Sequence, residues 1–452
     1  MKRLITIPLA TLAALALAFA LLAPKLLGFS ATQLPAAVRV ATGMGAKLAC
    51  SAYFVSGFDK DRILEDLASY SPANRLLDLE YGAQSVTATL FGLGKTSATF
   101  RKDLGCSLDI GNTAPLNTVR APAPIAVDAP WPAGDKLDSI DPALQLRLDA
   151  ILAKDNGAGL DTRALVVVQD GKLVAESYGP GIDARTPLLG WSMGKSVTAM
   201  LYGRMEALEI ANSAGTPLFS SWADDARAKI EMDDLLHMAS GLQFDETYAP
   251  GSDSTRMLFN AHSASDVAMD SPALHTPGQH FSYSSGTTNL IARWVHDQLG
   301  GSAQESINFL HRELLQPLGM QHTILETDPS GVFVGSSYIY ASGRDWARLG
   351  QVMLDKGEMN GQRILSEDWV ARAQAPNNSE NDPRYGYQFW LNGGGDALRF
   401  PELPADAYFM LGNREQALMI SPATGTVIVR VGWTATDYPT GENFSQLLPA
   451  SH

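Results

Sequence analysis

The sequence predicts a mixed α/β (α+β) fold, in which an antiparallel sheet flanked by helices contains an inserted helical region and follows a small N-terminal subdomain. Two β-rich runs flank Asp170-Gly171, a dipeptide typical of tight hairpins. A second pair of β-rich runs, 417–420 and 427–431, lies near the C-terminus. Between these hairpins the apolar residues mostly follow a helical period. Strands at both ends with helices between them indicate one sheet built from both parts of the chain.

The first 28 residues indicate export. Lys2 and Arg3 precede an uncharged, mostly apolar run from 4 to 23. A run of this length is typical of either a cleaved signal peptide or a membrane anchor, and both interpretations stay open. Positive charge before the run favours a cytoplasmic N-terminus and export of the remaining chain. We expect the periplasmic or extracellular side, with anchoring to the inner membrane if the segment is not cleaved.

The next region, 29–120, is predicted to be a small subdomain that contains both cysteines of the chain, Cys50 and Cys106. Export favours a disulfide between them, because exported proteins fold in an oxidising compartment. Two unpaired buried thiols are the alternative. Residues 121–139 are rich in Pro and Ala, which predicts an extended connector to the main domain, 140–452.

Ser192 and Lys195 stand at the start of a helical pattern, after a loop that contains Pro187 and Gly190. Their spacing places Lys195 one turn above Ser192 on the same helix face. A serine hydroxyl needs a proton acceptor to attack a carbonyl, and a buried lysine can be neutral enough to serve. The alternative is a helix start with a capping serine and a solvated lysine.

Tyr283 lies in a turn, 277–285, just ahead of a second helical pattern. A tyrosine in a loop that enters a cleft can hold its phenol against Ser192 and Lys195. Ordinary packing of a half-buried phenol is the alternative. The two motifs together point to nucleophilic catalysis more strongly than either motif alone.

These motifs resemble the serine β-lactamase and penicillin-binding-protein superfamily, in which Ser-x-x-Lys and Tyr-x-Asn or Tyr-x-Ser converge on one site. Segments 234–242, 316–320 and 341–350 resemble further family motifs in the same order. Segments 238–248 and 385–390 are most similar to a class C-type branch that contains 6-aminohexanoate-dimer hydrolases and related esterases. The resemblance implies a β-lactamase/D,D-peptidase-like fold for the main domain.

The third family element, usually Lys-Thr-Gly or His-x-Gly, matches 412–416. Asn413 then replaces the usual cation and Glu415 replaces a glycine, which puts recognition of a β-lactam carboxylate in doubt. The resemblance implies that the backbone N–H of Gln416 joins that of Ser192 in an oxyanion hole. An ordinary hairpin edge is the alternative.

Two weaker candidates for lining the cleft are Ser285, where the family often has Asn, and Tyr248. For both residues, ordinary surface or packing is an equally good interpretation.

Other classes fit less well. Residues 190–194 match the Gly-x-Ser-x-Gly elbow of α/β-hydrolases, but the preceding segment, 181–187, is polar and contains proline instead of forming a buried strand. No histidine pair has a zinc-protease spacing, so we expect no metal and no cofactor. The net charge of −14 without a basic run argues against nucleic acid as a partner.

We therefore expect an exported serine hydrolase that cleaves an ester or linear amide bond of a small molecule through an acyl-enzyme. Ser192 would attack, while Lys195 and Tyr283 relay its proton; which of the two is the principal base stays open. A β-lactamase or D,D-peptidase-like penicillin-binding protein is one alternative. A non-catalytic envelope binding or scaffold protein is another.

Overall fold

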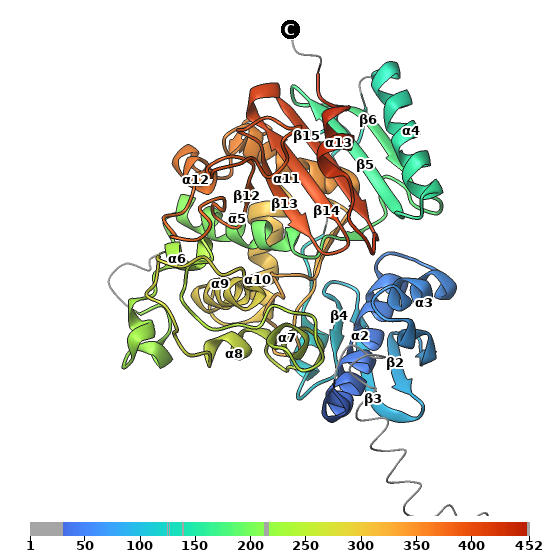
Figure 1. Ribbon diagram of the computed structural model, residues 1–452, viewed down its shortest axis with the longest axis vertical. Helices are drawn as coiled ribbons and strands as arrows, with labels where there is room; N and C mark the ends of the chain where they lie inside the picture. The colour runs from blue at the N-terminus through green and yellow to red at the C-terminus, as the bar shows by residue number, and fades with distance from the viewer. Residues whose placement is uncertain (1–29, 124, 126, 138–139, 212–216, 450–452) are drawn as a thin grey trace, which may run out of the picture.

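The computed structural model describes residues 30–449, except 124, 126, 138–139 and 212–216 (Figure 1). The predicted signal peptide or anchor, 1–28, lies outside the described residues. In the described part of the chain, no helix combines the length and apolar character that crossing a bilayer requires.

The main sheet has six antiparallel strands in the order β12-β13-β14-β15-β5-β6. The two predicted hairpins are β5–β6 and β14–β15, and they meet where β5 pairs with β15. The strands span β5 (Thr162–Gln169), β6 (Lys172–Tyr178), β12 (Trp390–Leu391), β13 (Tyr408–Gly412), β14 (Gln416–Ser421) and β15 (Thr426–Gly432). The predicted sheet, built from two distant parts of the chain, is confirmed.

Both faces of this sheet are buried. On β5, Val166 and Val168 belong to the larger core, which α11 (Gly343–Leu354) covers, whereas Leu165 and Val167 belong to a second core. Helices α4 (Pro142–Gly157) and α13 (Thr440–Ser445) supply apolar side chains to that second core. Because successive residues of a strand point to opposite faces, burial of both faces explains why the β-rich runs are almost continuously apolar.

The inserted region between β6 and β12 is mainly helical, as predicted (Figure 1). Its helix α5 (Met193–Ala207) is buried along nearly its whole length and packs against α9 (Ser285–Gln298). The insertion also contains a small antiparallel sheet, β7-β9-β8, that the sequence did not indicate, since its strands have only two or three residues each. The remaining elements are β7 (Leu188–Leu189), α6 (Met232–Leu236), α7 (Asp253–Phe259), α8 (Ala264–Met269), α10 (Ala303–Leu310), β8 (Thr323–Leu325), β9 (Ile339–Ala341), β10 (Glu358–Met359), β11 (Gln362–Arg363) and α12 (Glu367–Ala373).

The N-terminal region forms its own antiparallel sheet in the order β1-β2-β3-β4, covered by a long helix, α2 (Leu34–Phe54). One side of α2 lies against this sheet, and the other side contacts α7 of the insertion. A Cβ atom on Gly43 would lie 2.3 Å from the carbonyl oxygen of Phe259, so the close approach of α2 and α7 requires glycine there. The other elements are α3 (Lys60–Ala68), β1 (Leu77–Tyr81), β2 (Ser85–Leu90), β3 (Leu93–Arg101) and β4 (Gly105–Leu108).

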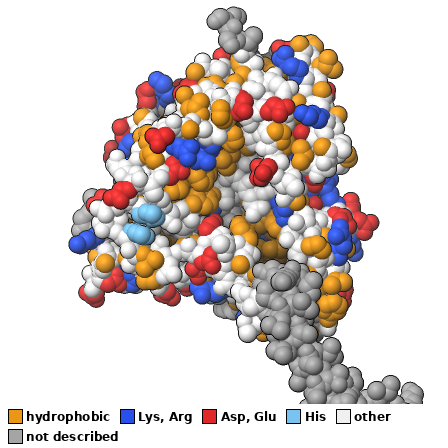
Figure 2. All heavy atoms as spheres, in the orientation of Figure 1, with side chains coloured by type: hydrophobic (Ala, Val, Ile, Leu, Met, Phe, Trp, Pro, Cys, Tyr) orange, Lys and Arg blue, Asp and Glu red, His pale blue; other side chains and the backbone are white. Residues whose placement is uncertain are grey.

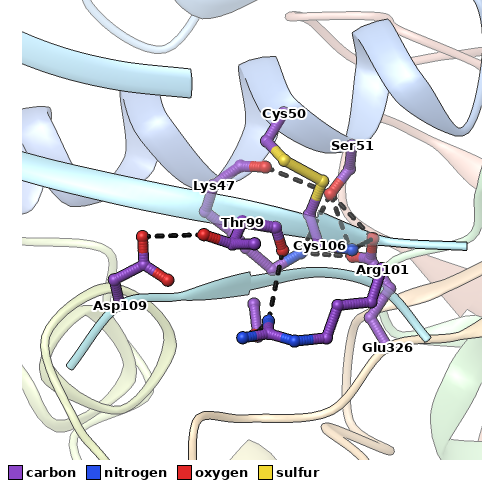
Figure 3. The surroundings of a disulfide bond; sticks show 9 residues. Lys47, Cys50, Ser51, Thr99, Arg101, Cys106, Asp109 and Glu326 are labelled. Atoms are coloured by element: carbon purple, nitrogen blue, oxygen red, sulfur yellow. Dashed lines mark hydrogen bonds and ion pairs between the residues drawn. A yellow bond between two sulfur atoms is a disulfide. The ribbon is translucent and has the colours of Figure 1, made fainter. Parts of the chain in front are cut away.

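The expected disulfide is present and joins Cys50 on α2 to Cys106 on β4 (Figure 3). Beside it, the buried carboxylate of Glu326 accepts hydrogen bonds from Lys47, from Ser51 and from the backbone N–H of Cys106. Glu326 belongs to the main domain, whereas its three donors belong to the N-terminal region. Burial raises the pKa of Glu326 and lowers that of Lys47, and the ion pair opposes both effects. This buried pair therefore fixes the N-terminal region against the main domain.

Candidate active site

Ser192 lies at the junction between a tight turn and the N-terminus of α5. Trp191, just before it, has a φ of 47° and is fully buried, and rings of Tyr70, Tyr338 and Trp433 surround its indole. A left-handed backbone at a bulky residue is uncommon and marks a strained turn held by its surroundings. The hydroxyl of Ser192 makes no capping bond to the helix. The turn therefore leaves this hydroxyl free for other contacts.

Lys195 is the nearest basic group to that hydroxyl. Its Nζ atom lies 2.9 Å from Ser192 Oγ and 2.9 Å from Ser285 Oγ, and donates to the carbonyl of Ser336 at 3.3 Å. Lys195 is 1% exposed, which excludes a solvated charge. Burial lowers its pKa to about 8, although the carboxylate of Glu246 acts in the opposite direction. About a tenth of Lys195 is thus neutral at pH 7, far more than for a lysine with the ordinary pKa of about 10.4.

Tyr283 completes the group around the nucleophile. Tyr283 and Ser192 line the same cavity, and the Nζ atom of Lys195 lies 4.7 Å from the centre of the Tyr283 ring. Burial raises the pKa of Tyr283 well above its ordinary value. The ring stacks on Trp390, with 5.0 Å between ring centres. The phenol is consequently held in its protonated form beside Ser192, where it can pass on a proton.

Ser285 links the lysine to a carboxylate that the sequence analysis did not single out. Its hydroxyl donates to Glu246 Oε1 at 2.5 Å, and its backbone N–H donates to Glu246 Oε2 at 2.7 Å. The contacts form a chain from Ser192 through Lys195 and Ser285 to Glu246. Glu246 is one of 48 acidic residues, and only its place in the segment 238–248 could have drawn attention to it.

Ser192, Tyr283 and Glu246 line one cavity of about 280 Å³, whereas Lys195 and Ser285 lie behind its wall. Figure 2 shows a hollow near the centre of this face of the molecule, with side chains of both charges around it. The residues around the cavity are Ser192, Glu246, Tyr248, Tyr283, Trp390, Arg399, Leu411, Gly412 and Asn413. Tyr248 and Asn413 line it as the sequence suggested.

Gln416 occupies a different position from the other candidates. Its side chain is buried and bonds both backbone groups of Gly432, with Nε2 donating at 2.6 Å and Oε1 accepting at 2.8 Å. Its partner across the β13–β14 hairpin is Gly412, which borders the cavity. A Cβ atom on Gly412 would lie 3.1 Å from the backbone nitrogen of Ser192, so this hairpin approaches the nucleophile closely. The oxyanion role of the Gln416 N–H stays a prediction.

The turn of this hairpin contains the position where Glu415 replaces the family's glycine. Arg414 and Glu415 both have left-handed backbone, with φ values of 64° and 61°. The family's glycine at the position of Glu415 adopts this conformation without strain, whereas other residues do so at a cost of roughly 1 kcal/mol.

Within the described residues, no cluster of three or more His, Cys, Asp or Glu side chains is placed to hold a metal ion.

Comparison with known proteins agrees with this geometry. The family model for Beta-lactamase matches residues 148–443. A protein assigned as a 6-aminohexanoate-dimer hydrolase from Bacillus anthracis is 21% identical, with a TM-score of 0.54 over 65% of this chain and 79% of that chain. A family VIII carboxylesterase is 11% identical, with a TM-score of 0.53 over 69% of this chain and 98% of its own. A class C beta-lactamase variant is 13% identical, with a TM-score of 0.51 over 67% and 97%.

Proposed function

Because this chain belongs to the beta-lactamase family, we propose that it is a serine hydrolase that cleaves an ester or linear amide bond through an acyl-enzyme. The observation that carries the proposal is the position of Ser192 Oγ, 2.9 Å from the buried Nζ of Lys195, with Tyr283 on the wall of the same cavity. A nucleophile needs an adjacent base with a pKa near the working pH, and Lys195 meets both requirements.

In this mechanism neutral Lys195 takes the proton of Ser192 as the oxygen attacks the substrate carbonyl. The opposite effects of burial on the two candidates favour Lys195 as the base, since burial makes the amine easier to deprotonate and the phenol harder. The tetrahedral oxyanion accepts hydrogen bonds from backbone amides of Ser192 and, as the family pattern implies, Gln416. Tyr283 donates its proton to the leaving oxygen or nitrogen as the bond of that atom to carbon breaks, and the Lys195 ammonium returns a proton to the phenolate, so both groups regain their starting states. Water then cleaves the acyl-enzyme by the same relay.

The substrate class follows from Asn413. A neutral amide in place of a cation offers weaker binding to a β-lactam carboxylate, because charge-assisted hydrogen bonds are roughly twice as strong as neutral ones. We therefore favour esters and linear amides over β-lactams. The β-lactamase or D,D-peptidase activity stays the second candidate, supported by the family itself. Intact contacts among Ser192, Lys195 and Tyr283 weigh against a non-catalytic binding or scaffold role.

We also propose that the protein is exported, with its hydrolase domain over 140–452. The disulfide between Cys50 and Cys106 supports export, because such bonds are rare in reducing compartments. The division into 29–120, a connector over 121–139 and the main domain stays part of this proposal.

The test is covalent labelling of Ser192 combined with a substrate screen. We expect a fluorophosphonate probe to label the wild-type protein and to fail on Ser192→Ala, whose turnover of p-nitrophenyl esters should fall by several orders of magnitude. Ser221→Ala, which removes an exposed hydroxyl, is the matched control. Esters, linear amides and a chromogenic cephalosporin form the screen. Labelling or turnover that survives Ser192→Ala would contradict the assignment.

A further inference from the structure

One side chain of the cavity has no role in the chemistry above. Arg399 lies in the loop between β12 and β13 and lines the same cavity as Ser192 and Asn413. Its guanidinium carbon lies 4.4 Å from the centre of the Trp390 ring. Trp390 in turn stacks on Tyr283, the proposed proton donor. Two stacked rings thus connect this guanidinium to the reacting groups.

The guanidinium is incompletely paired. Its Nε and Nη2 atoms are shielded from solvent and have no hydrogen-bond acceptor among the described residues. Two other guanidinium groups with little exposure are paired with carboxylates: Arg344 binds Glu176, and Arg348 binds Asp345 and Asp135. Arg414 has one shielded nitrogen without an acceptor, Nε, whereas Arg399 has two. A buried charged donor without an acceptor costs folding free energy, so its retention calls for an explanation.

Acidic side chains near Arg399 already have other partners. Asp382 accepts from Arg384 Nε at 3.1 Å, and Glu246, on the cavity wall, accepts from Ser285. Arg384 also adds positive charge near Arg399. Arginine stays protonated in proteins, so Arg399 places a positive charge on the cavity wall. Among the described residues, its Nε–H and Nη2–H groups have no acceptor.

We propose that Arg399 binds a carboxylate of the substrate, which makes the preferred substrates anionic esters or amides. Parallel N–H groups of a guanidinium are spaced for the two oxygens of a carboxylate, which would approach Arg399 from the cavity that this residue lines. Contact with the Trp390 ring restricts the orientation of the Arg399 guanidinium. Arg399 supplies a cation to the cavity in place of the one that is absent at position 413. Because Arg399 lies in the loop between β12 and β13, it would bind the carboxylate at a different place from position 413. This inference rests on the proposed hydrolase function.

Two matched pairs of esters test it, one for each side of the scissile bond. Mono-p-nitrophenyl glutarate and p-nitrophenyl pentanoate differ by a carboxylate on the acyl group. The esters 4-acetoxybenzoate and phenyl acetate differ by a carboxylate on the leaving group. In at least one pair, we expect Arg399→Gln to lower kcat/KM for the anionic member by roughly 10- to 100-fold relative to the neutral member. Arg399→Lys, which keeps the charge without the parallel N–H groups, should give an intermediate loss.

Arg75→Gln is the control, because it removes an exposed guanidinium of the N-terminal region that is paired with Glu65. Its anionic-to-neutral ratio should equal that of the wild type. Thermal unfolding gives a second measurement that does not need turnover. Glutarate or benzoate should raise the melting temperature of Ser192→Ala, and the added Arg399→Gln change should abolish this increase.

The outcomes separate the two proposals. An unchanged anionic-to-neutral ratio in both ester pairs, with neutral esters still hydrolysed, would overturn the carboxylate site and leave the hydrolase function standing. Absence of ester turnover and of Ser192 labelling would overturn the hydrolase function. In that case the melting temperatures still test whether Arg399 binds anions. If glutarate or benzoate raises the melting temperature only when Arg399 is present, the carboxylate site is supported.

Discussion

The contact chain that ends at Glu246 predicts how the activity depends on pH. Lys195 Nζ lies 2.9 Å from Ser285 Oγ, which lies 2.5 Å from Glu246 Oε1, so the ammonium and carboxylate are no more than about 5.5 Å apart. At an effective dielectric constant of about 20, opposite charges at that distance attract by about 3 kcal/mol. Glu246→Gln removes the charge but keeps an oxygen that can accept from Ser285. The pKa of Lys195, about 8 in the wild type, should therefore fall.

The sign follows from the role of the lysine. The base must be neutral, so kcat/KM rises with pH through the pKa of Lys195 in the free enzyme. Without the carboxylate the ammonium form loses a stabilising partner, and the rising limb moves to lower pH. The assay is a pH profile of p-nitrophenyl ester hydrolysis, repeated with the rate of fluorophosphonate labelling. Glu80→Gln, at an exposed position of the N-terminal sheet, is the control. A limb that stays in place or moves to higher pH would refute the reasoning.

Three further predictions concern the relay, the substrate and the disulfide. Lys195→Ala and Tyr283→Phe should each be severe and their double variant little worse, because groups that act as a unit are non-additive; multiplying losses in kcat/KM would indicate separate roles. Cephalosporin hydrolysis should be slow or absent beside p-nitrophenyl ester hydrolysis, and a faster cephalosporin rate would show that the argument from Asn413 is wrong. Cys50→Ser with Cys106→Ser should lower the free energy of unfolding by about 4 kcal/mol for a sequence separation of 56 residues, as measured by denaturant titration; an unchanged midpoint would contradict this.

Local patterns predicted the elements whose geometry depends on near neighbours in the chain. The Asp170-Gly171 hairpin and the helix after Ser192 follow from turn chemistry and apolar period. The meeting of Ser192 and Lys195 was predictable for the same reason, since residues three apart on a helix share a face. The small sheet β7-β9-β8 was not predictable, because strands of two or three residues carry too little pattern.

By itself, then, the sequence determined the fold class, the contact between Ser192 and Lys195, the family, and, from the only two cysteines, the disulfide. Only the tertiary structure decided which distant side chains surround them. Glu246 reaches Ser285 across 39 residues, and Arg399 enters the cavity from the loop between β12 and β13. Neither residue could be recognised from the sequence around it, because that sequence does not show whether a charged side chain in a loop faces water or a cleft. Long-range packing, which no short segment encodes, places these charges in the cavity and lowers the pKa of Lys195 by burial.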